Sequence, residues 1–151
     1  KVLYLGASTG TTVSHVSDIV GPEGLIFAVD LAPRVLRELI FLSYNRKNII
    51  PILEDASKTS SLKERISLVD VIYQDIAQKD QVRIFLKNVN LFLKEKGYAI
   101  LALKSRSIDV TKRPKEVYRE VLKELEKHLT VIDYRVIDPF QKDHAMFICK
   151  N

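Results

Sequence analysis

The sequence is poor in cysteine and has no long apolar run, and each absence excludes a class of protein. Cys149 is the single cysteine in 151 residues, so no intramolecular disulfide can form and nothing points to an oxidising compartment. No apolar run approaches the roughly 20 residues that a membrane-spanning helix needs, and we expect no secretory leader. We therefore expect a cytoplasmic protein with no membrane partner and no metal site.

The composition is that of a globular domain with a modest excess of positive charge. Hydrophobic residues make up 46% and charged residues 28%, and the length suits one domain. The formal charge of +5 is one that many small domains carry without binding nucleic acid. Its placement is more informative, because five basic residues but only one acid, Asp109, fall between Lys104 and Lys115. This stretch is either a phosphate-binding surface or a solvated loop.

Short apolar segments rich in Val, Ile and Leu predict the strands of a buried sheet. They cover residues 1–5, 25–29, 49–53, 69–73 and 98–103. Between them, apolar residues recur at spacings of three and four, which is typical of helices. We expect helices over residues 11–20, 33–40, 60–66, 82–93 and 114–125, with Gly97 closing the fourth. The strict alternation predicts a parallel sheet covered by helices on both faces.

The end of the chain departs from this alternation. Residues 130–137 and 145–149 predict two strands with only a short loop, containing Asp138-Pro139, between them. Strands joined in this way pair antiparallel or lie at a sheet edge. Five strands with helical crossovers and a terminal hairpin are the pattern of a class I S-adenosylmethionine-dependent methyltransferase, an α/β Rossmann-like fold with a seven-stranded sheet. A dinucleotide-dependent oxidoreductase would more often end with another helical crossover.

A glycine-bearing loop follows the first predicted strand. Gly6 and Gly10 have the spacing Gly-x-x-x-Gly, which does not match the Gly-x-Gly-x-x-Gly fingerprint of dinucleotide-binding folds. Asp30 ends the second strand, where an acid can accept hydrogen bonds from ribose hydroxyls. Asp30 could instead cap the helix that begins near Pro33. The loop and the acid together favour a ligand that carries a nucleoside.

Polar side chains also follow the third and fourth strands. Asp55 and Ala56 come after the third strand, and Asp75 and Gln78 come after the fourth. Capping explains any one of these positions, but the carboxyl ends of parallel strands meet at one edge of a sheet, where crevice ligands bind. We therefore expect one ligand site along this edge.

Four segments, in this order along the chain, resemble the fibrillarin family, especially its archaeal members. They are YLGASTGTTVSHVSDIVGPEG (4–24), DIAQ (75–78), LKSRSIDVTK (103–112) and QKDHA (141–145). The strings GTTVSHVSDIVG and KSRSID are far more specific than a glycine motif. The small N-terminal domain of the family has no counterpart here, so we expect residues 1–151 to form a single methyltransferase catalytic domain.

The resemblance implies S-adenosylmethionine-dependent 2′-O-methylation of ribose in rRNA and tRNA. In the family a box C/D guide RNA selects the target, within a ribonucleoprotein that holds a Nop-family scaffold protein and a kink-turn-binding ribosomal-type protein. The location it implies is an archaeal-type cytoplasm, or the nucleolus in a eukaryote. Two alternatives remain open: a non-catalytic RNA- or protein-binding scaffold module with the same fold, and a protein glutamine methyltransferase.

The resemblance also implies which residues hold S-adenosylmethionine. The implied set is Gly6, Ala7, Thr11 and Thr12 for the methionine part, Asp30 for the ribose, Leu31, Asp55 and Ala56 for the adenine side, and Asp75 and Gln78 for the reactive end. Archaeal relatives usually carry Glu-Phe where this chain has Asp30-Leu31, which removes an aromatic contact with the adenine. Glu54 stands where the relatives usually carry glycine.

The family's catalytic set is Lys-Asp-Lys-His, and Asp75, Lys104 and His144 match its last three members. The first lysine would lie before the first strand. A ribose hydroxyl is a poor nucleophile until it loses its proton, so the resemblance suggests Lys104 as base, with Asp75 and His144 orienting or relaying. Each could instead be structural, Lys104 as a strand-end cation, Asp75 as a helix cap and His144 as a packed histidine.

The basic stretch adjoins this catalytic set along the sequence. We therefore expect Arg106, Lys112 and Arg113 to contact RNA phosphates.

Overall fold

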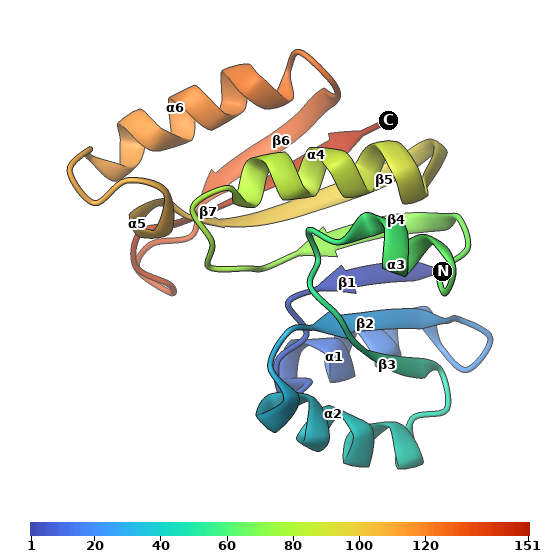
Figure 1. The fold of residues 1–151 in the computed structure, drawn as a ribbon. Coiled ribbons are helices and arrows are strands. Elements are labelled where there is room, and N and C mark those ends of the chain that lie inside the picture. The colour runs from blue at the N-terminus through green and yellow to red at the C-terminus, as the bar shows by residue number, and fades with distance from the viewer.

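The computed structural model describes residues 1–151 as one seven-stranded sheet with helices packed on it (Figure 1). The strands are β1 (Val2–Leu5), β2 (Ile26–Asp30), β3 (Ile49–Leu53), β4 (Val69–Gln74), β5 (Leu93–Lys104), β6 (Thr130–Val136) and β7 (His144–Lys150). The helices are α1 (Thr11–Val20), α2 (Pro33–Asn45), α3 (Thr59–Lys63), α4 (Gln81–Phe92), α5 (Ser105–Ile108) and α6 (Pro114–Leu125). None of these helices combines the length and the apolar character needed to cross a membrane.

The strand order is β3-β2-β1-β4-β5-β7-β6, and it confirms the predicted fold class. Strands β1 to β5 pair in parallel, while β7 runs antiparallel between β5 and β6. The order places β1 and β4 side by side at the centre, so the loops after them meet. A crevice for a ligand opens at such a reversal of strand order, outside the carboxyl ends of the strands.

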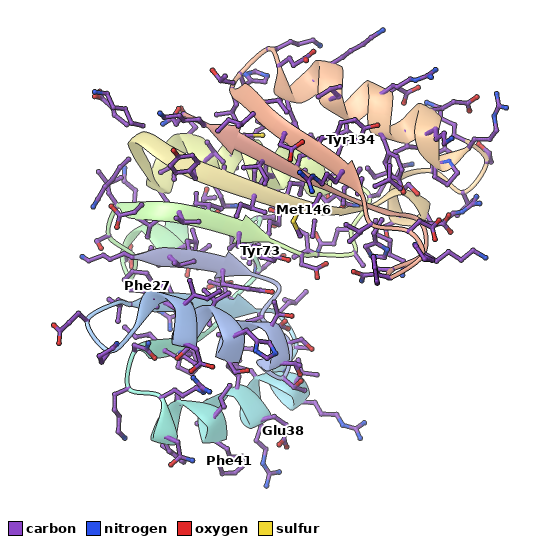
Figure 2. All side chains as sticks on the ribbon, turned by 180° about the vertical axis from the view of Figure 1, so that it is seen from behind. Phe27, Glu38, Phe41, Tyr73, Tyr134 and Met146 are labelled. Atoms are coloured by element: carbon purple, nitrogen blue, oxygen red, sulfur yellow. The ribbon has the colours of Figure 1, made fainter.

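The two faces of the sheet are covered unequally. Helices α3, α4 and α6 lie over one face and bury the larger apolar core, which includes Phe85, Phe92 and Phe147. Helices α1 and α2 lie on the other face over β1, β2 and β3, where Leu39 packs in a smaller core. Figure 2 shows the rest of that second face, on which Tyr73 and Met146 lie with no helix of this chain above them.

Two local features differ from the sequence-based expectation. Helix α4 ends at Phe92, because Leu93 already pairs with Val69 of β4. Gly97 therefore lies inside β5, where a Cβ atom would come 2.9 Å from the carbonyl oxygen of Asp70. Glycine at this position permits a close approach of two backbones and does not end a helix. The second feature is α5, a single helical turn that the apolar periodicity of the sequence did not predict.

Candidate active site

A cleft of about 300 Å³ opens at the carboxyl edge of the sheet, between the loops that follow β1, β2, β3 and β4. Six of the residues expected to hold a cofactor line it: Gly6, Asp30, Leu31, Ala56, Asp75 and Gln78. Four others lie outside its lining: Ala7, Thr11, Thr12 and Asp55. The cleft is also lined by five residues not in the expected set: Ser8, Val29, Glu54, Ile76 and Ala77.

The loop after β1 needs glycine at two positions for different reasons. Gly6 has a φ of 87°, and a Cβ atom there would lie 2.0 Å from the carbonyl oxygen of Asp75. Gly10 has a φ of 95°, and a Cβ atom would lie 2.8 Å from the Cδ1 atom of Leu39. Gly10 precedes α1 and supplies no side-chain cap, so the first N–H groups of α1, at Thr11 and Thr12, are left for other partners.

Asp30 ties the glycine loop to the start of α2. Its Oδ2 accepts a hydrogen bond from the Ser8 N–H at 2.7 Å, and its Oδ1 accepts one from the Ala32 N–H at 2.9 Å. The cap of α2 is Ala32, not Asp30, so the capping alternative is wrong in detail. A carboxylate oxygen has two lone pairs, so each oxygen of Asp30 can accept a further bond from a ribose hydroxyl.

Glu54 takes the place in the cleft that was expected for Asp55. Asp55 Oδ1 accepts a bond from the Ser57 N–H at 2.8 Å, and this bond lowers the pKa of the Asp55 carboxyl. Asp55 therefore stabilises a turn and does not line the cleft. Glu54 accepts hydrogen bonds from Ser61 Oγ and the Asp55 N–H, which lower the pKa of its carboxyl. Its position directly after β3 was the signal in the sequence that marked it.

The three expected catalytic residues come together from three strand ends. Asp75 follows β4, while Lys104 is the last residue of β5 and pairs in register with His144, the first residue of β7. Burial raises the pKa of the Asp75 carboxyl, because a desolvated carboxylate is disfavoured. The positive charges of His144 and Lys104 oppose this rise, which places both near Asp75.

His144 is buried, 6% exposed, and both of its ring nitrogens have partners. Nδ1 lies 2.7 Å from the carbonyl oxygen of Lys142, so Nδ1 must donate a proton to that oxygen. Nε2 lies 3.2 Å from Nε2 of Gln141 and accepts from that amide. These two contacts within its own loop fix the orientation of the ring, which suits a residue that orients others.

Each basic residue expected to contact RNA has an acidic partner in the fold. Arg106 pairs with Asp143 at 3.2 Å, Lys112 with Glu120 at 2.7 Å, and Arg113 with Glu116 at 2.7 Å. The count of one acid in this stretch was misleading, because acids from outside it lie close to the basic residues in the fold. Glu116 and Glu120 come from α6, and Asp143 comes from the loop before β7. Exposed ion pairs stabilise by only about 0–1 kcal/mol, so an RNA phosphate can compete for these cations.

A larger groove of about 940 Å³ lies elsewhere, between α4 and α6. Val82 and Leu86 contribute to it, and none of the expected site residues does. The carboxyl-edge cleft is therefore the place where the sequence-based site and the geometry agree.

Comparison with known proteins identifies relatives over the whole chain. The family model described as Fibrillarin matches residues 1–151. The fibrillarin-like rRNA/tRNA 2′-O-methyltransferase of Pyrococcus abyssi is 50% identical over 150 residues, which are 99% of this chain and 66% of that protein. The protein of the same description from Methanocaldococcus jannaschii is 50% identical over 98% of this chain and 64% of its own length. The chain thus spans slightly less than two thirds of these relatives.

Solved structures give the same picture. The Methanococcus jannaschii fibrillarin pre-rRNA processing protein has a TM-score of 0.94 at 49% identity, covering 99% of this chain and 65% of that one. A chain of a fibrillarin/Nop5p complex has a TM-score of 0.95 at 46% identity, and the match covers 98% of this chain and 70% of that one. Aeropyrum pernix fibrillarin with natively bound S-adenosyl-L-methionine has a TM-score of 0.89 at 45% identity, and the match covers 99% of this chain and 65% of that one.

Proposed function

Because the chain belongs to the fibrillarin family, we propose that it transfers a methyl group from S-adenosylmethionine to a ribose 2′-hydroxyl of RNA. The observation that carries this proposal is the convergence of Asp75, Lys104 and His144 beside a cleft that also contains Asp30. The names of the relatives, which act on rRNA and tRNA, support RNA as the substrate.

The residues of the cleft fit S-adenosylmethionine. A Cβ atom at Gly6 would fill space next to the Asp75 backbone, so the glycine keeps the loop after β1 close to the loop after β4. Asp30 offers carboxylate lone pairs for ribose hydroxyls, and Ala56 and Leu31 offer apolar contact to the adenine. The A. pernix relative contains this cofactor natively. The bound cofactor supplies an already activated methyl group on its sulfonium.

The chain's own contribution is to position the hydroxyl and take its proton. Asp75 is the buried acid of the set, and a raised pKa makes its carboxylate a better proton acceptor than an ordinary aspartate. Lys104 acts on Asp75 as a cation and can hold the ribose or its phosphate against the site. His144, whose ring is held by its own loop, lies opposite Lys104 on the neighbouring strand. We assign the proton to Asp75 and the positive charge to Lys104.

The assembly follows from the same family membership. We place the chain in a ribonucleoprotein with a Nop-family scaffold protein, a box C/D guide RNA and a kink-turn-binding protein, with target rRNA or tRNA as substrate. The crystallised complex of a fibrillarin with Nop5p supports the scaffold partner. Arg106, Lys112 and Arg113 would exchange their carboxylate partners for RNA phosphates on assembly.

The test is transfer of tritiated methyl from S-adenosylmethionine to a target RNA, with the guide RNA and the two partner proteins present. A matched target carries a 2′-deoxynucleotide at the selected position. We expect label in the RNA target, none in the 2′-deoxy target, and none in protein. Label in both targets would place the methyl group on a base, and label in protein would favour glutamine methylation. Assembly without any label would favour a scaffold module.

A further inference from the structure

Gln81 is buried completely at the start of α4, and its side chain binds the backbone of two segments that border the site. Its Nε2 donates hydrogen bonds to the carbonyl oxygens of Gln78, at 2.9 Å, and Lys104, at 3.3 Å. Its Oε1 accepts a hydrogen bond from the Lys104 N–H, also at 3.3 Å. One carboxamide therefore holds both backbone groups of Lys104 and the loop that carries Gln78.

This arrangement compensates for a missing strand partner. The ladder between β4 and β5 ends at the pair Gln74 and Leu101, while β5 continues for three more residues to Lys104. The N–H and C=O groups of one strand residue point to the same side of the strand. On the side of β4, the backbone groups of Lys104 therefore have no strand residue to bond to, because β4 has already ended. The Gln81 carboxamide has the donor and acceptor of a peptide group, and it occupies that place.

Gln74, the residue directly before Asp75, is also connected to Gln81. Its side chain is also completely buried, and its Nε2 donates to the carbonyl oxygen of Gln81 at 2.7 Å. Its Oε1 has no partner within the protein. A buried acceptor without a partner is unfavourable. Gln74 and Gln81 thus link the ends of β4 and β5 through α4.

We propose that Gln81 is a positioning residue, which fixes the separation between Lys104 and the Asp75–Gln78 loop. The proposal rests on the methyl transfer proposed above. Gln81 does not line the cofactor cleft, so its effect on catalysis would pass through the backbone of Lys104. A displacement of about 1 Å in a catalytic group can cost about 100-fold in rate, because the reacting atoms must be aligned.

Asn48 provides a matched control far from the site. It is a buried amide with the same number of side-chain bonds: Nδ2 donates to the carbonyl oxygens of Ser17 and Gly21, and Oδ1 accepts from Ser17 Oγ. These groups lie at the C-terminal end of α1, on the opposite side of the molecule from the cleft. Removing the Asn48 amide therefore measures the effect of losing any buried amide with three hydrogen bonds, and this can be compared with the effect of losing the Gln81 amide.

The experiment compares the intact chain with Gln81→Met and Asn48→Leu in the assembled ribonucleoprotein. It measures turnover, the Kd for S-adenosylmethionine, thermal unfolding and the hydrogen exchange of individual amides. For Gln81→Met we expect turnover about 10- to 100-fold lower, a Kd changed less than about threefold, and faster exchange at the Lys104 amide but not at Leu101. For Asn48→Leu we expect a lower unfolding temperature with turnover retained.

Several outcomes would overturn the proposal. Unchanged exchange at Lys104 in Gln81→Met would show that the clamp does not hold that residue. Faster exchange with unchanged turnover, or equal losses of turnover in Gln81→Met and Asn48→Leu, would leave Gln81 a purely structural residue. If Gln81→Met folds poorly, Gln81→Asn withdraws the amide by one methylene and permits the same comparison. An inactive wild-type assembly would instead refute the proposed function, while the exchange at Lys104 would still test the clamp.

Discussion

Lys104 and His144 lie directly opposite each other on β5 and β7, at the end of the antiparallel ladder nearest the cofactor cleft. Strand pairs of this kind bring side chains on one face within about 5 Å at the Cβ atoms. The terminal hairpin therefore has a direct part in the site, because it delivers a histidine to a lysine that the parallel part of the sheet supplies. Asp75 reaches the same place from β4.

Asp75→Asn should remove the proton acceptor while preserving the shape of the site. We expect turnover to fall by about 10²–10⁴-fold, the usual contribution of a general base, and the Kd for S-adenosylmethionine to change far less than turnover does. The matched control is Asp133→Asn on the edge strand β6, where the carboxylate pairs only with Arg135. A fall in turnover equal to that of the control would contradict the assignment.

The same substitution should change the dependence of stability on pH. Burial raises the folded-state pKa of Asp75, so the folded protein holds this proton more tightly than the unfolded chain does. The carboxyl therefore costs no stability at acid pH, and it becomes destabilising as the pH rises from the ordinary value of 3.8 through the folded pKa. We expect Asp75→Asn to unfold at a higher temperature than wild type at pH 7, and the difference to vanish near pH 3. Lower stability of the variant at pH 7 would contradict this sign.

Lys104→Arg and Lys104→Ala separate the two roles that lysine can have. Arginine keeps the positive charge but cannot act as a base, because its guanidinium stays protonated in proteins. If Lys104 acts as a cation, the arginine variant should keep at least about a tenth of the turnover and the alanine variant should lose about 100-fold or more. Equal inactivity of both variants, with normal binding of cofactor and RNA, would favour the base role.

Gly6→Ala should be far more damaging than Gly21→Ala. Both glycines have positive φ values, 87° and 72°, so both substitutions carry a backbone penalty of about 1–3 kcal/mol. Only Gly6 adds a collision, since its Cβ atom would lie 2.0 Å from the Asp75 carbonyl oxygen, whereas nothing lies within 4 Å of a Cβ at Gly21. We expect Gly6→Ala to lose cofactor binding and to unfold at a lower temperature than Gly21→Ala. Similar behaviour of the two variants in calorimetry would contradict the close approach.

Cys149 should be inert in the native protein. It is completely buried on β7, and this burial raises the pKa of its thiol to about 11, so the reactive thiolate is scarce at pH 8. We expect no labelling by a thiol reagent in native buffer and one label per chain in denaturant. Rapid labelling without denaturant would show that β7 opens locally.

The sequence predicted the fold well because its signals were local and mutually consistent. The apolar segments and helical periodicities each matched an element, and the terminal hairpin identified the fold class. Gly97 was misassigned because a glycine near a helix end is usually a cap, and only the pairing of Leu93 with Val69 shows that the strand has begun. The partner of Arg106 lies 37 residues along the chain and that of Lys112 eight residues along, so both acids fall outside a count over residues 104–115.

The site was predicted at its strand ends but not in its supporting residues. Asp30, Asp75 and Gln78 were expected there because each lies at or just after the end of a strand, and all three line the cleft. Gln81 was missed, since a buried glutamine at the start of a helix has no pattern in sequence that distinguishes it from a surface residue. Its two hydrogen bonds to the Lys104 backbone form where β4 has ended and β5 continues.

The central claim is that the carboxyl-edge cleft is an S-adenosylmethionine site with Asp30 as its ribose ligand. Calorimetric titration of the chain with S-adenosylmethionine, and separately with NAD, tests it most directly. We expect saturable one-to-one binding of S-adenosylmethionine alone, weakened about 10- to 100-fold by Asp30→Ala because charge-assisted hydrogen bonds are lost. Binding of NAD alone, or an Asp30→Ala protein that binds S-adenosylmethionine as tightly as wild type, would contradict the account.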